Sequence, residues 1–60
     1  MKLYVYKVIR EHLDGSQGKR AKRYICFEPK LKVGGLYAHL GTGFPGFQRV
    51  LSMSEEKLPD

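Results

Sequence analysis

The sequence has little of what usually stabilises a small domain. It holds one cysteine, Cys26, and no tryptophan among its 60 residues. One cysteine cannot form an internal disulfide, and a lone thiol in a short chain suits a reducing compartment. A chain of this length buries only about 60% of the surface that its unfolded form exposes. The sequence therefore predicts one domain, residues 1–60, with a small core and no covalent cross-link.

No segment is apolar for long enough to cross a membrane as a helix. The longest uncharged stretch, residues 33–48, contains five glycines, and such a stretch cannot span a bilayer. Residues 1–10 include Lys7 and Arg10 and lack a cleavage site of small residues, so we do not expect a secretory signal. We expect a cytoplasmic protein with no membrane partner.

No complete catalytic, metal-binding or cofactor-binding motif is present. Residues 41–46, Gly-Thr-Gly-Phe-Pro-Gly, fit the G-x-G-x-x-G pattern of dinucleotide sites. That pattern needs a helix after it, and the residues that follow are typical of a strand, so we interpret 41–46 as a hairpin loop. His12 and His39 lack the spacing of zinc ligands; we expect His12 at the surface and His39 packed on a strand. Cys26 lies between apolar residues without a neighbouring base. We predict no cofactor, no metal and no enzymatic activity.

What the sequence does have is a set of short runs rich in tyrosine, valine and isoleucine, separated by glycine and proline. Such runs are typical of β-strands. An Asp14-Gly15 turn joins the first two runs and the glycine-rich loop joins the last two, so we predict two hairpins. The predicted fold class is all-β, with a small antiparallel sheet of four to five strands. The runs are residues 2–13, 19–28, 36–40 and 47–53.

Three local features allow more than one interpretation. Residues 5–14 also have helical spacing of their apolar side chains, but β-branched and aromatic residues in series are poor helix formers, so we favour a strand. The glycine pair 34–35 is a candidate corner of the sheet. Residues 54–60 are expected to be a short turn, with Ser54 as a helix cap, or a frayed tail.

In the C-terminal half, a glycine precedes a Tyr-x-His run, a glycine turn follows, and a second run ends in Arg-Val-Leu. The residues are Leu31, Gly34, Tyr37, His39, Gly41, Phe47, Arg49, Val50 and Leu51. This order resembles that of small SH3-like β-barrel domains of unknown function from bacteria. The resemblance implies a five-stranded or incomplete barrel, and it implies no activity, because such barrels serve many unrelated functions.

The charge of the chain is positive and unevenly distributed. Eleven lysines and arginines face six acids, for a formal net charge of +5 at pH 7. Residues 1–50 carry +7 and residues 51–60 carry −2. This distribution suggests a polyanionic partner or an acidic tail that folds back onto a basic surface, although charge also serves solubility alone.

The strongest functional signal is a basic run. Lys19, Arg20, Lys22 and Arg23 fall within five positions and are followed by Tyr24. Cations attract phosphate backbones through counterion release, and an exposed tyrosine can stack on an unpaired base. We predict a non-enzymatic accessory module that binds nucleic acid through these five residues. On a strand, Lys19 and Arg23 would share one side; edge lysines can also serve only to prevent aggregation.

The alternative function is a protein-interaction module. Both faces of the run 2–13 are partly apolar, which is more than a small core is expected to bury. A sheet edge can accept a peptide as an added strand. A homodimer could instead form through an aromatic face of Tyr4, Tyr6 and Tyr37.

Overall fold

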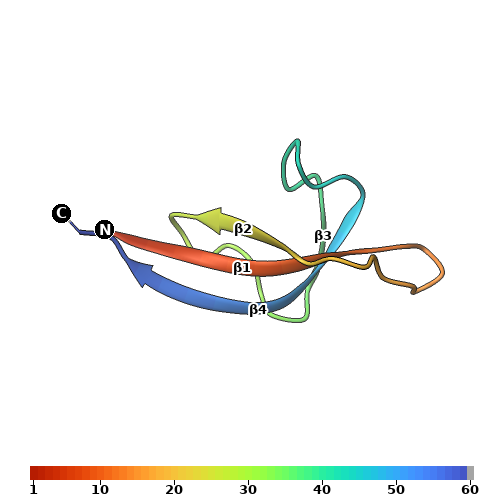
Figure 1. The fold of residues 1–60 in the computed structure, drawn as a ribbon, viewed down its shortest axis with the longest axis horizontal. Helices are drawn as coiled ribbons and strands as arrows, with labels where there is room; N and C mark the ends of the chain where they lie inside the picture. The colour runs from red at the N-terminus through yellow and green to blue at the C-terminus, as the bar shows by residue number, and fades with distance from the viewer. Residues whose placement is uncertain (60) are drawn as a thin grey trace.

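The computed structural model describes residues 1–59 and shows one open antiparallel sheet without a helix (Figure 1). The strand order is β2-β1-β4-β3. The all-β prediction and both predicted hairpins are confirmed, and the helical alternative for residues 5–14 is wrong. The strands are β1 (Lys2–Glu11), β2 (Lys22–Cys26), β3 (Leu36–Ala38) and β4 (Phe47–Lys57).

The first hairpin turns through a three-residue loop, residues 13–15. The amide of His12 donates to the Ser16 carbonyl (2.7 Å), and the amide of Gly15 donates to the His12 carbonyl (2.9 Å). Gly15 has a φ of 89°, as the last residue of such a loop requires. The exposed position expected for His12 is confirmed.

The centre of the sheet is the long pairing of β1 with β4. It runs from Lys2 opposite Lys57 to Glu11 opposite Phe47. One irregularity interrupts it, because Lys7 pairs with Ser52 while Val8 pairs with Val50. Leu51 is therefore an extra residue on β4, which makes a β-bulge and increases the local twist.

The C-terminal segment is a strand as far as Lys57, so a turn or frayed tail was the wrong expectation for residues 54–57. Each of these residues pairs with β1, and the amide of Leu58 donates to the Met1 carbonyl (2.9 Å). Serine and glutamate favour strands only weakly, but the partner strand supplies the ladder. Residue 60 lies outside the described residues.

The core lies on one face of the sheet. Tyr6, Val8 and Val50 are fully buried there. Residues 27–35 connect β2 to β3 across this face, and the amide of Leu31 donates to the Tyr6 hydroxyl (3.3 Å). We call this the covered face and the opposite one the open face. Leu31, Leu40 and Phe44 pack against the buried residues together with Tyr4, Tyr24, Cys26 and Tyr37.

The aromatic face expected to form a homodimer is part of this core. Tyr6 is buried, and Tyr4 and Tyr37 are half-buried against it. The Tyr37 hydroxyl also accepts a hydrogen bond from the Lys32 amide (2.9 Å). Tyr4 and Tyr6 share one parity with Val8, and Tyr37 pairs with Gln48 on the same side of the sheet, so all three tyrosines belong to the covered face.

The third strand is shorter than expected and ends before His39. That histidine is exposed rather than packed on a strand, and it has a φ of 58°. A left-handed backbone leaves the extended ladder, which explains why β3 stops at Ala38. Residues 41–46 then form the expected hairpin loop to β4.

The glycine pair 34–35, predicted as a corner of the sheet, lies in a turn that precedes β3. The amide of Gly35 donates to the Lys32 carbonyl (3.0 Å), and Gly34 has a φ of 86°. This combination is a type II turn with glycine at its third position. The turn leads directly into the sheet, because Gly34 and Gly35 each hydrogen bond to the backbone of Val50.

We expect Gly34→Ala to lower the free energy of unfolding by about 1–2 kcal/mol, the cost of a left-handed residue with a side chain. An added Cβ would meet no atom within 4 Å, so the loss comes from the backbone alone. Gly43→Ala is the matched control, since its added Cβ also meets no atom and Gly43 has no positive φ. Urea denaturation measures both, and equal midpoints for the two variants would contradict this role of Gly34.

Candidate nucleic-acid interface

The structure separates the five residues of the basic run. Residues 19–21 lie before β2. Gly18 hydrogen bonds to Arg10 and Lys22 pairs with Val8. The three residues 19–21 therefore lie opposite a single residue of β1, Ile9. The run is therefore a bulged connection that enters a strand only at Lys22. The expected sharing of one strand side by Lys19 and Arg23 is not observed, since Lys19 lies outside the strand.

Within β2, Lys22 and Arg23 point to opposite faces. Lys22 pairs with Val8 and is on the covered face, whereas Arg23 pairs with Lys7 on the open face. The open face thus holds two cations directly opposite each other, an arrangement that destabilises a sheet unless an anion is near.

Three cations from two separate segments meet on the covered face. Arg10, Arg20 and Lys22 line a hollow of about 160 Å³ with Pro45 and Gln48. Arg10 and Gln48 are direct cross-strand partners on β1 and β4. They lie one pair beyond Val8 and Val50 on the same face, where the apolar core ends. We call this site the basic hollow.

The loop between β3 and β4 holds one wall of the basic hollow. Lys22 Nζ donates to the Gly43 carbonyl (2.9 Å) and lies 5.9 Å from the centre of the Phe44 ring. Gln48 Nε2 donates to the Pro45 carbonyl (2.9 Å) and is buried. The hollow is therefore held by contacts between β2, β4 and this loop.

Tyr24 does not have the exposed position expected of a base-stacking residue. Its ring packs edge-on against Phe44, with the ring centres 5.2 Å apart and an interplanar angle of 89°. Tyr24 is half-buried against the core. Tyr24 follows the cations in the sequence. In the structure it pairs with Tyr6 on β1, so its side chain is on the covered face.

The cations of the basic hollow have no acidic partner among residues 1–59. The ion pairs in that part of the chain are Lys2 with Glu55 (3.9 Å) and Arg49 with Glu11 (2.6 Å). Neither involves Arg10, Arg20 or Lys22. Three cations close together without counter-charge produce a positive local potential that favours an anionic ligand.

A second hollow adjoins the first and holds an exposed aromatic ring. It measures about 450 Å³, and its walls include Arg10, His12, Asp14 and Phe47. Phe47 is 43% exposed. Arg10 lines both hollows, whereas Phe47 pairs with Glu11 and belongs to the open face. Sequence spacing did not show that Arg10 and Phe47 line the same hollow, because they are far apart in the chain.

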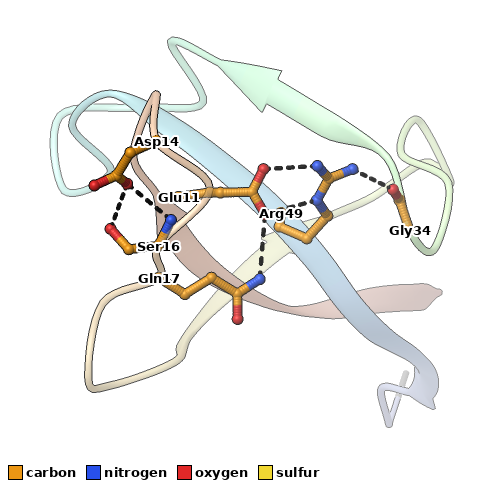
Figure 2. A network of polar contacts seen from close by, with 6 residues as sticks. All are labelled: Glu11, Asp14, Ser16, Gln17, Gly34 and Arg49. Atoms are coloured by element: carbon orange, nitrogen blue, oxygen red, sulfur yellow. Dashed lines mark hydrogen bonds and ion pairs between the residues drawn. The ribbon is translucent and has the colours of Figure 1, made fainter.

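Arg49, unlike the cations of the basic hollow, has an acidic partner, Glu11 (Figure 2). It donates from Nε (3.1 Å) and Nη2 (2.6 Å) to the Glu11 carboxylate and from Nη1 to the Gly34 carbonyl (2.8 Å). Gln17 also donates to Glu11 (3.2 Å). The hydrogen bonds from Arg49 and Gln17 hold the pKa of Glu11 below its ordinary value of 4.5. This network joins the first hairpin, β4 and the Gly34 corner.

We expect the network to make stability depend on acidity. Because the folded pKa of Glu11 is lowered, its contribution is fully present above pH 4.5 and is lost as the pH falls through the folded value. Glu11→Gln should lower the unfolding free energy at neutral pH, and its difference from the wild type should shrink as the pH falls below 4.5. Urea denaturation over a series of pH values from neutral to acidic measures this difference. A difference that stays constant over the series would contradict the prediction.

Other reactive groups are isolated. Burial raises the pKa of the Cys26 thiol, which keeps it protonated at neutral pH. Within residues 1–59, no three His, Cys, Asp or Glu side chains are grouped as metal ligands would be. The same residues contain no helix of the length and hydrophobicity needed to span a bilayer.

Comparisons with protein-family models, with curated proteins and with solved structures found no match to this chain. The interpretation of the site therefore rests on the geometry and charge of its own residues.

Proposed function

We propose that the protein is a non-enzymatic accessory module that binds single-stranded nucleic acid at the basic hollow. The observation that carries this proposal is the convergence of Arg10, Arg20 and Lys22 on one hollow without an acidic partner in residues 1–59. Phosphate groups repeat along a nucleic-acid chain, so several cations can each neutralise one phosphate. Each such contact releases counterions and adds to the binding affinity. Lys19, exposed at the start of the run, would contact a neighbouring phosphate, whereas Arg23 lies on the open face, away from the basic hollow.

The exposed ring of Phe47 favours binding of single-stranded over double-stranded nucleic acid. Its exposed ring lines the hollow that adjoins Arg10. An unpaired base can stack on such a ring, which contributes about 1–3 kcal/mol per base, whereas the bases of a duplex are already stacked on one another. A phosphate at Arg10 with a base on Phe47 uses both hollows at once.

The resemblance to SH3-like barrels is part of the same proposal. Its support is that residues 31–51 form a corner at Gly34 followed by a hairpin, within one twisted sheet. Small barrels and partly open barrels bind oligonucleotides on their faces and loops.

A protein-interaction module is the second candidate. The observation in its favour is the open face, where Ile25 and Leu36 are 54% and 42% exposed. Exposed apolar side chains on one face of a sheet are typical of surfaces that another protein covers. Lys7 and Arg23 lie on the same face, so such a partner would have to carry acidic groups.

Fluorescence anisotropy tests the proposed function directly. Labelled single-stranded DNA and RNA, with duplex DNA as a comparison, are titrated with the protein from about 50 to about 200 mM salt. We expect binding to single strands that weakens steeply with salt. Absence of binding at the lowest salt would overturn the proposal and leave the protein-interaction module as the function to test.

A further inference from the structure

The outer edge of β4 is only partly covered. β3 pairs with β4 at residues 47–49, and Gly34 and Gly35 bond to Val50. Beyond that point β4 continues through the bulge residue Leu51 and residues 52–57, which pair with β1 and, within residues 1–59, with no other strand. All seven residues are exposed. We call residues 51–57 the free edge; Figure 1 shows it as the end of β4 that extends past β3 toward the two termini.

We propose that the free edge pairs antiparallel with the same edge of a second copy, giving a two-fold dimer with one continuous sheet. An open edge presents unpaired backbone N–H and C=O groups that can pair with another strand. The free edge contains no proline, and the β-bulge lies at its start, at Leu51, so residues 52–57 remain regular. The charged side chains of the free edge are confined to its end, at Glu55, Glu56 and Lys57.

The length of the free edge defines the register. It begins after Val50, where Gly34 already occupies the backbone, and β4 ends at Lys57. Its midpoint is Ser54. A two-fold axis at Ser54 places Leu51 opposite Lys57 of the second copy, so that all seven residues on each copy find a partner.

The charges agree with this register. The free edge holds Glu55, Glu56 and Lys57, a local charge of −1. With the axis at Ser54, Glu55 lies opposite Met53 and Glu56 lies opposite Ser52, so no acid faces an acid. Moving the axis to Glu55 or Glu56 would place that glutamate opposite its own copy, which destabilises a sheet.

An apolar contact supports the same arrangement. Met53 pairs with Tyr6 of β1 and is therefore on the covered face, where it is 40% exposed. In the proposed register the two copies of Met53 are diagonal neighbours across the axis, within reach of long side chains. The dimer would cover both.

Sedimentation equilibrium from about 10 µM to about 1 mM protein tests the dimer. We expect the mass to rise from 6.9 kDa toward twice that value. Because each copy has a net charge of +5, added salt should strengthen the dimer, whereas it should weaken binding to nucleic acid. The two proposals can therefore fail separately. A wild-type protein that stays monomeric throughout would overturn the dimer.

Ser54 variants test the register. Ser54→Lys would put two cations directly opposite each other, and we expect the dissociation constant to rise at least about tenfold. Thr42→Lys, which adds the same charge on an exposed loop away from the edge, should dimerise like the wild type. Ser54→Glu alone should dimerise as weakly as Ser54→Lys, but an equal mixture of the lysine and glutamate variants should form heterodimers with a lower dissociation constant than either variant alone. Unchanged dimerisation of Ser54→Lys, or a mixture that stays monomeric, would overturn the register.

Discussion

The triple variant Arg10→Gln, Arg20→Gln, Lys22→Gln should bind single-stranded DNA about a hundredfold more weakly than the wild type at about 0.1 M salt. Each phosphate contact to a single strand contributes about 0.7 to the slope of log K against log salt. Losing three contacts should therefore reduce that slope by about two, and the reduced slope is the more specific signature. Anisotropy over a salt series measures both quantities.

The result is informative only against variants of equal charge. Lys30→Gln, Lys32→Gln, Lys57→Gln removes three cations from exposed positions outside the basic hollow, and it should keep most of the affinity. If both triple variants lose affinity equally, net charge rather than the basic hollow drives binding. Circular dichroism is needed for the first variant, because Lys22 also bonds to the Gly43 carbonyl.

Tyr6→Ala should remove a large part of the protein's stability. Truncating a buried aromatic residue costs about 3–5 kcal/mol, while a chain of this length has a total stability of roughly 3–9 kcal/mol. Tyr6 is fully buried between the sheet and the connection of residues 27–35. Its hydroxyl accepts a hydrogen bond from the Leu31 amide of that connection. Its loss removes a large part of a core that has three fully buried side chains in the described residues.

Tyr6→Phe separates the ring from its hydroxyl. This variant keeps the apolar contacts but leaves the Leu31 amide without its acceptor, at a cost of about 1–3 kcal/mol. We therefore expect a folded protein with a lower urea midpoint. If Tyr6→Ala were no less stable than Tyr6→Phe, packing of the ring would not be what holds the connection against the sheet.

The positions of the strands were predictable because the patterns that indicate them involve residues close together in the sequence. Alternating apolar side chains identified β1, and turn residues identified both hairpins and the turn at Gly34. The length of β4 could not be predicted in this way. Ser54 and Glu55 have weak strand preference, and they are extended because β1 is long enough to pair with them. That partner is more than 40 residues away in sequence.

The candidate site was predictable only in part. Arg20 and Lys22 were visible as a basic run, but the third cation, Arg10, belongs to a different strand. It joins them because the Val8–Lys22 and Arg10–Gln48 pairings put these side chains on one face. The same parity turns Tyr24 into the core and Arg23 away from the basic hollow. A register between distant strands is set by the whole core, and a local run of residues does not contain it.

The pairing of β1 with β4 also has a consequence for how the chain folds. Partners in this central pair are separated by 36 residues at Glu11–Phe47 and by 55 at Lys2–Lys57. Contacts between such distant residues slow folding, because the loop between them must close first. During synthesis, only the β1–β2 hairpin can form early, and an isolated hairpin is marginally stable in water. The core, which needs Val50, cannot assemble until β4 has left the ribosome, so nascent chains remain sensitive to proteases until β4 has emerged.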